Sequence, residues 1–157
     1  MVDHAAALAE ALTRRSLTIA VAESCTGGMV GAAITSLPGS SRFFVGGIIA
    51  YSNNVKERLL GVPHSLLKSV GAVSREVASA MAQGARKALE TDGAVAITGI
   101  AGPEGGSEKK PVGLVYIAAC TKSREVVKEF RFTGSRDQIR AQATIEALQM
   151  MRDAVTP

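Results

Sequence analysis

The segment GSSRFFVGGIIAYSNNVK at residues 39–56 contains three side chains that together could carry out nucleophilic chemistry. Ser41 lies before an apolar run, and Tyr51 and Lys56 follow that run. A serine hydroxyl is a weak nucleophile until a base takes its proton, and a neutral lysine amine can be that base. We therefore expect Ser41 as the nucleophile, Lys56 as its base and Tyr51 as a proton relay or orienting group.

For this role Lys56 must lose its proton near neutral pH, so its pKa must fall well below the ordinary value of ~10.4. Burial lowers the pKa of a lysine, and so does the positive end of a helix dipole. Lys56 lies about one turn into the helix expected after Ser52. A simpler interpretation stays open, in which Lys56 lies on a solvated helix face, GSS is an ordinary turn and Tyr51 only packs.

A second reactive stretch, AESCTGG at residues 22–28, lies at the end of an apolar run and before an expected helix. Cys25 is a rival nucleophile, because a thiol at a helix N-terminus can have a lowered pKa. A catalytic cysteine usually has a histidine partner, however, and none is placed for it, so Cys25 can equally be a small buried residue. The other members resemble an anion or oxyanion cradle at a helix N-terminus: Ser24, Thr26, Gly27 and Gly28.

Two further segments could contact a substrate in the same way. Thr98 and Gly99 follow another apolar run, and Arg136 follows Ser135 at the start of the last expected helix. A plain turn or helix cap is the alternative at each position.

Several kinds of site are not expected from the sequence. The only histidines are His4 and His64, and neither follows an expected strand, which disfavours a Ser-His-Asp triad or a zinc site. The glycine clusters lack the spacings of a P-loop or a dinucleotide fold. We therefore expect no metal and no cofactor.

The apolar pattern indicates how these residues are positioned. Short, continuous apolar runs are typical of strands buried on both faces, and here they alternate with helical patterns. Such alternation predicts a three-layer α/β/α fold with a mixed, largely parallel sheet, in which ligands gather at the carboxyl ends of the strands. The expected elements are helices at 5–14, 29–37, 52–61, 74–89 and from Ser135, and strands at 17–23, 45–51, 93–98, 113–120 and 125–132.

Length and composition limit the remaining possibilities. The 157 residues predict a single domain at 1–157. Its net charge of +4 is dispersed and aromatic residues are scarce, so nucleic acid is not an expected partner. No apolar stretch is long enough to span a bilayer, so a membrane is not an expected partner either. Two distant cysteines and the absence of a signal-peptide pattern indicate a reduced, cytoplasmic setting.

Five motifs, AESCTGG, GSSRFFVGGIIAYSNNVK, GAVS, TGIAGPEGGSEKKPVG and FTGSRD, resemble the CinA C-terminal domain family, the nicotinamide mononucleotide amidohydrolases. The resemblance covers about residues 5–152, and TGIAGPEGGSEKKPVG is the most specific part. Longer family members carry an N-terminal domain that resembles molybdopterin-binding proteins. We expect that domain to be absent here, so that the chain is the stand-alone form.

This resemblance implies hydrolysis of nicotinamide mononucleotide to nicotinate mononucleotide and ammonia in pyridine nucleotide salvage, by a metal-independent Ser-Lys-Tyr arrangement. Matching by motif position assigns Ser41, Lys56 and Tyr51 to catalysis and places Ser24, Thr98 and Arg136 around the nucleotide. Family membership and the frequency of two-fold assemblies favour a homodimer. Three alternatives stay open: an amidase for another pyridine amide, a non-catalytic nucleotide-binding module, and an interaction protein linked to competence or DNA damage.

Overall fold

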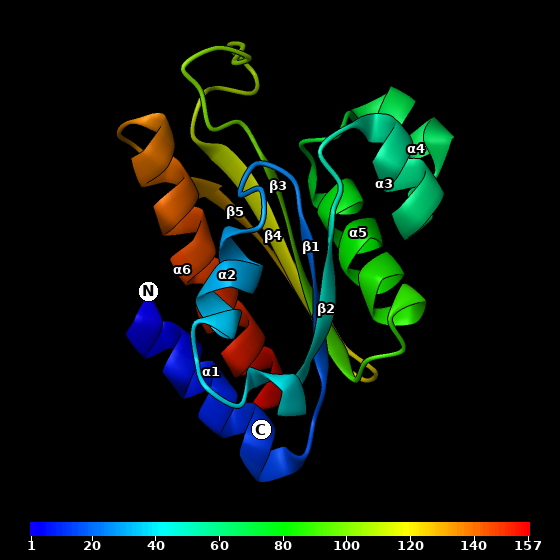
Figure 1. The fold of residues 1–157 in the computed structure, drawn as a ribbon. Coiled ribbons are helices and arrows are strands. Elements are labelled where there is room, and N and C mark those ends of the chain that lie inside the picture. The colour runs from blue at the N-terminus through cyan, green and yellow to red at the C-terminus, as the bar shows by residue number, and fades with distance from the viewer.

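A computed structural model describes all of residues 1–157. The protein has three layers, with one sheet between two layers of helices (Figure 1). Helices α1, α2 and α6 cover one face, and α3, α4 and α5 lie on the other (Figure 1). None of the helices is long and apolar enough to cross a membrane. In chain order the elements are α1 (Val2–Arg15), β1 (Ile19–Glu23), α2 (Met29–Thr35), η1 (Ser40–Arg42), β2 (Phe44–Ile49), α3 (Asn53–Leu60), α4 (His64–Val70), α5 (Arg75–Ala88), β3 (Gly93–Gly99), β4 (Leu114–Thr121), β5 (Glu125–Arg131) and α6 (Arg136–Val155).

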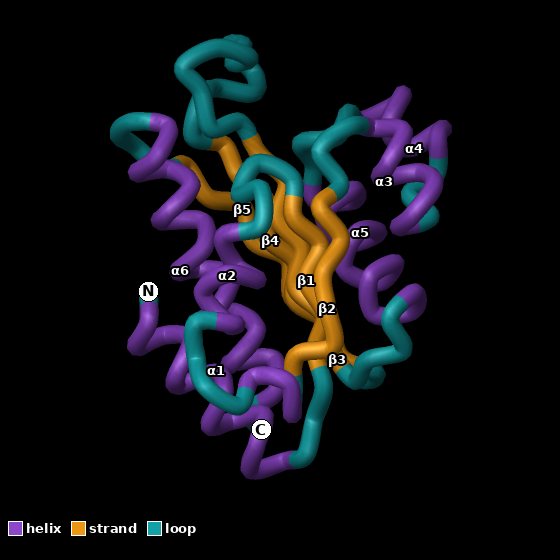
Figure 2. The backbone as a smooth tube through the Cα atoms, in the orientation of Figure 1, coloured by secondary structure: helices purple, strands orange, loops and turns teal.

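The sheet has five strands in the order β2-β1-β3-β4-β5. β1 pairs in parallel with both β2 and β3, and β4 pairs antiparallel with both β3 and β5. Only β4 therefore runs against the other strands, which confirms the predicted mixed, largely parallel sheet. The loops that follow β1, β2 and β3 consequently meet at one end of the sheet (Figure 2).

Residue size alternates along the three central strands and separates two apolar clusters. Larger side chains pack toward α1, α2 and α6, namely Ile19, Val21, Val95, Ile97, Val115 and Ile117. Alanines pack toward α5, namely Ala20, Ala22, Ala94, Ala96 and Ala118.

The small side chains on that face let the helices approach closely. A Cβ atom built on Gly84 of α5 would lie 1.9 Å from the carbonyl oxygen of Leu60, the last residue of α3. This close approach fixes α3 against α5, and α3 is the helix that carries Lys56.

The predicted helix starts are confirmed at three serines. The side chains of Ser52, Ser74 and Ser135 accept hydrogen bonds from backbone amides in the first turns of α3, α5 and α6. Ser135 and Gln138 also form the predicted capping box. Each cap begins a helix next to the carboxyl edge of the sheet, and so sets where the side chains of that helix enter the site.

Candidate active site

A pocket of about 270 Å³ lies where the loops after β1, β2 and β3 meet. This is the end of the sheet, at the carboxyl ends of the strands, where the sequence predicts ligand binding. Four of the residues expected there from the sequence contribute hydroxyl, basic or backbone groups to its wall, namely Ser24, Lys56, Thr98 and Arg136, and Tyr51 and Gly99 also line it.

Lys56 is the most unusual side chain in this pocket, because it is a lysine that is 1% exposed. Its Nζ lies 3.0 Å from Ser24 Oγ, 2.9 Å from the carbonyl oxygen of Ala50 and 3.1 Å from that of Tyr51. A charged amine has three N–H donors, one for each oxygen. A neutral amine donates to the two carbonyls and accepts the Ser24 hydroxyl with its lone pair. The same arrangement therefore serves both protonation states, as a proton-shuttling base requires.

Burial also lowers the pKa of Lys56, because desolvation disfavours the ammonium ion. None of the six ion pairs in the protein includes Lys56, so no carboxylate offsets that effect. Lys56 lies in the first turn of α3, where the helix dipole further disfavours a cation. The predicted neutral lysine therefore has a physical basis.

Ser41 does not lie at this pocket, which corrects the predicted nucleophile. It is exposed in η1, directly before β2, whereas Lys56 follows β2. A six-residue strand spans about 20 Å, so Ser41 lies at the amino ends of the parallel strands and Lys56 at their carboxyl ends. Ser24 follows β1, which runs parallel to β2, and this places its hydroxyl at the same edge as Lys56.

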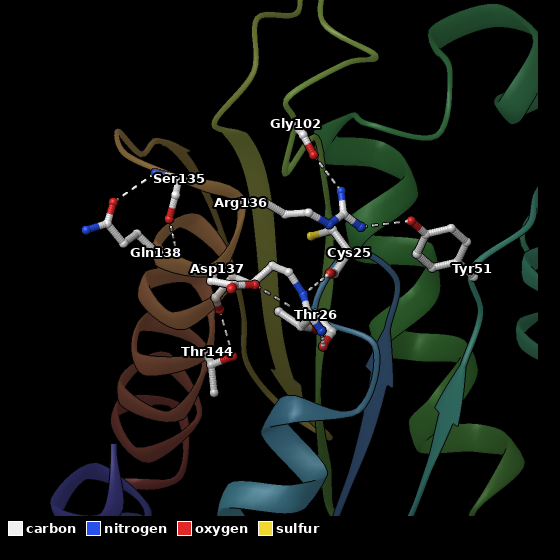
Figure 3. A network of polar contacts seen from close by, with 10 residues as sticks. Cys25, Thr26, Tyr51, Gly102, Ser135, Arg136, Asp137, Gln138 and Thr144 are labelled. Carbon is white, nitrogen blue, oxygen red and sulfur yellow. Dashed lines mark hydrogen bonds and ion pairs between the residues drawn. The ribbon is translucent and has the colours of Figure 1, made fainter.

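Tyr51 lines the pocket but does not contact the lysine through its hydroxyl. Its carbonyl oxygen accepts from Lys56, while its phenol oxygen lies 3.3 Å from Arg136 Nη2 (Figure 3). Tyr51 as a whole is 62% exposed. The predicted relay from Ser41 through Tyr51 is therefore wrong in this geometry, and Tyr51 instead holds Lys56 by its backbone and Arg136 by its side chain.

The expected anion cradle in AESCTGG is already occupied by a carboxylate of the protein. Glu23, 1% exposed, accepts from the amides of Gly28, Val30 and Gly31 at 2.9, 3.2 and 2.9 Å. Gly27 and Gly28 have φ angles of 59° and 104°, a conformation that favours glycine. These two glycines therefore shape the turn, and Glu23 rather than a substrate caps α2.

Thr26, the remaining member of that cradle, is also turned away from the pocket. It is fully buried, it does not line the pocket, and its hydroxyl has no hydrogen-bond partner. The structure therefore does not bring Thr26, Gly27 or Gly28 to the wall of the pocket as the sequence predicted.

Removing the Glu23 carboxylate should destabilise the fold. Glu23→Ala leaves three amides without their acceptor, and we expect the free energy of unfolding to fall by about 3 kcal/mol, since bonds to charged groups are the stronger ones. Urea unfolding with an unchanged m-value measures this loss. Glu10→Gln, which breaks only an exposed pair with Arg14, is the matched control and should change stability by less than about 0.5 kcal/mol. An equal effect of both variants would contradict the assigned role of Glu23.

Thr98, Gly99 and Arg136 lie at the pocket as predicted. The Thr98 hydroxyl donates to the carbonyl oxygen of Ala72 at 2.9 Å, which joins β3 to the start of α5. Arg136 Nη1 donates to the carbonyl oxygen of Gly102 at 2.6 Å, so Arg136 bridges the glycine-rich loop and Tyr51 (Figure 3).

Cys25 lines the pocket as a neutral thiol. Burial raises its pKa to about 11, and its own backbone amide and the Arg140 charge only partly oppose this. The thiolate is the nucleophilic form of cysteine, so Cys25 is not activated at neutral pH. Ser24, expected from the sequence only as part of a cradle, has the base Lys56 beside its hydroxyl, whereas Cys25 has none.

Two residues that shape the site, Glu23 and Arg140, were not predicted from the sequence. Glu23 ends a run of buried strand residues, and a carboxylate in such a place needs a partner. Arg140 follows Arg136 by four positions, one helical turn, so both arginines point from α6 toward the site loops. The strand-end position of Glu23 and the four-residue spacing of the arginines were the signals available in the sequence.

The fold and the site together define an α/β domain in which a buried lysine contacts a serine at the carboxyl ends of the parallel strands. The profile of the family described as the CinA C-terminal domain matches residues 2–155. The chain belongs to this family.

Relatives agree with this assignment. The chain is 51% identical over 146 residues to a CinA-like protein of Geobacter sulfurreducens. The matched region covers 93% of this chain and 35% of the relative. It therefore spans about a third of the length of the curated relatives that it matches.

Solved structures extend the likeness to the whole fold. The competence/damage inducible protein CihA from Agrobacterium tumefaciens has a TM-score of 0.97 and 38% identity, over 99% of this chain and 95% of that chain. A competence-damaged protein (CinA) superfamily protein from Escherichia coli has a TM-score of 0.93 and 32% identity, over 97% of this chain and 90% of that chain.

Proposed function

We propose that this protein is an amidohydrolase that converts nicotinamide mononucleotide to nicotinate mononucleotide and ammonia, with Ser24 as nucleophile and Lys56 as base. The observation that carries the proposal is the 3.0 Å contact between Lys56 Nζ and Ser24 Oγ, with both other positions on the amine taken by backbone carbonyls. The motifs shared with the CinA C-terminal domain family supply the choice of substrate.

In the first half of the reaction, neutral Lys56 takes the Ser24 proton while Ser24 Oγ bonds to the carboxamide carbon. The π electrons of the carbonyl move to its oxygen and form an oxyanion. When the carbonyl reforms, the C–N bond breaks, and the ammonium of Lys56 returns the proton to the departing nitrogen. Ammonia leaves and an acyl ester remains on Ser24.

In the second half, Lys56 takes a proton from water, and the resulting hydroxide oxygen attacks the ester carbon. Collapse of the second tetrahedral intermediate breaks the bond to Ser24 Oγ, and Lys56 gives the proton back to that oxygen. The carboxylic acid formed in this step gives its proton to water and leaves as the carboxylate, and both side chains return to their starting forms.

Arg136 is suited to the phosphate of the nucleotide. Of the two basic side chains in the pocket, Lys56 is held toward its neutral form, so Arg136 is the lasting positive charge there. A guanidinium can bind two phosphate oxygens at once. Arg136 and the Lys56–Ser24 pair line the same pocket, as a substrate with a carboxamide at one end and a phosphate at the other requires.

The test is release of ammonia and of nicotinate mononucleotide by the purified protein, followed by a coupled ammonia assay and by chromatography. We expect turnover of nicotinamide mononucleotide and a much lower kcat/KM for nicotinamide riboside, which lacks the phosphate. Equal turnover of both would favour an amidase for another pyridine amide. Binding of the nucleotide without ammonia release would favour a non-catalytic module and overturn the proposal.

A further inference from the structure

The turn that follows Ser24 is held by an arginine from the far end of the chain. Arg140 of α6 donates from Nε to the carbonyl oxygen of Cys25 and from Nη2 to that of Thr26, each at 3.0 Å. Figure 3 shows Cys25 and Thr26 near the pocket residues Arg136 and Tyr51. Arg140 does not line the pocket itself, so its contacts with the turn call for another explanation than substrate binding.

The backbone amide of Cys25 is a free donor directly beside the nucleophile. It donates to no backbone carbonyl of the protein. The amides of Gly27 and Gly28 in the same loop are taken by Ser24 O and by Glu23. Cys25 also lines the pocket. An amide on the residue after a serine nucleophile is well placed to stabilise an oxyanion.

The direction of that amide depends on the peptide groups around it. Because a peptide group is planar and trans, its N–H points opposite to its C=O. The Gly27 amide holds the carbonyl before the Cys25 nitrogen, and Arg140 holds the carbonyl after it. The second Arg140 contact completes the link: Arg140 Nη2 holds the Thr26 carbonyl, and the Gly27 N–H of that same peptide group holds the Ser24 carbonyl. Because the Ser24 carbonyl and the Cys25 N–H belong to one planar peptide group, this chain of contacts sets the direction of the Cys25 N–H.

We propose that the Cys25 amide is an oxyanion donor and that Arg140 is the positioning residue that keeps it aimed at the reacting carbonyl. This inference rests on the proposed function, because it assumes that Ser24 attacks. It extends that function to a residue outside the pocket.

The experiment measures how fast Ser24 is phosphonylated by an alkyl fluorophosphonate, with intact-mass and peptide mass spectrometry to locate the adduct. In this reaction the Ser24 Oγ–P bond forms, the P–F bond breaks, fluoride leaves and Lys56 takes the proton. The phosphoryl oxygen gains charge where the oxyanion of an amide would. We expect Arg140→Met to slow labelling about 10–100-fold, less than the 10²–10³ typical of deleting a donor, since the amide is present but free to turn.

Two readouts separate positioning from general damage to the fold. In amide hydrolysis Arg140→Met should lower kcat while KM changes by less than about threefold. Millimolar methylguanidine should restore part of the labelling rate of Arg140→Ala, because the Arg140 side chain is 27% exposed and a small cation can enter its place. Arg124→Met is the matched control: Arg124 also donates to a backbone carbonyl, that of Asp153, but at the opposite edge of the sheet.

The outcomes distinguish this inference from the proposed function. If the parent protein is labelled at Ser24 and Arg140→Met is labelled equally fast, the positioning role is wrong and the nucleophile assignment stands. If the parent is neither labelled at Ser24 nor active on the amide, the proposed function fails and the inference fails with it. A third outcome is that Arg140→Met and Arg124→Met are labelled equally slowly and that methylguanidine does not restore the rate of Arg140→Ala. Arg140 would then contribute only to stability.

Discussion

Ser24→Ala is expected to lower kcat for amide hydrolysis by about 10⁴–10⁶-fold, the usual result of removing a nucleophile from a unit that acts together. The reason is that no other hydroxyl lies on the lysine amine: Ser24 Oγ is the only side-chain oxygen in contact with Lys56 Nζ. Ammonia release over hours, compared with the parent protein at saturating substrate, measures the loss.

Ser41→Ala is the matched control, because it removes the same atoms from an exposed serine at the other edge of the sheet. Its rate should stay within twofold of the parent. A Ser41→Ala protein that lost activity while Ser24→Ala kept it would reverse the assignment and require the chain around β2 to fold differently.

The error over Ser41 has a geometric cause that the sequence already contained. Residues before and after one strand lie at opposite edges of a sheet, and the expected strand separated Ser41 from Lys56. Residues after two neighbouring parallel strands lie at the same edge, which is the relation between Ser24 and Lys56. The position of Ser41 in its motif does not reflect this constraint, whereas the predicted strand at 45–51 does.

The fold itself was largely predictable because its signals are local. Serine caps, the glycine end of α3 and the apolar strands each depend on a few neighbouring residues. The contacts that shape the site depend instead on pairs far apart in the chain, such as Arg140 with Cys25. The place of Glu23 at the end of a buried strand indicates that it needs a partner, but the sequence does not show which amides supply it, because that depends on how α2 turns back over β1.

Lys56→Met should lower kcat by about 10²–10⁴-fold, the usual contribution of a general base, and should change how the rate depends on pH. In the parent protein the rate should rise with pH through an ionisation below that of free lysine, because burial lowers the pKa of Lys56 and only the neutral amine accepts the Ser24 proton. The residual rate of Lys56→Met should lack that ionisation. A parent profile that is flat up to the ordinary lysine range would contradict the role of Lys56 as base.

The same shift predicts an effect on stability that needs no substrate. Because the pKa of Lys56 is lower in the folded protein than in the unfolded chain, the unfolded state binds more protons between those two values. The free energy of unfolding therefore rises with pH across that window, and the penalty for burying the amine is greatest below the folded-state pKa. In Lys56→Met this contribution is missing, so the stability advantage of the parent over the variant should grow as pH increases from 6 to 10. Urea unfolding of both proteins at several pH values measures this difference. A constant difference would mean that Lys56 keeps its proton in the fold, and a base that is always charged could not activate Ser24.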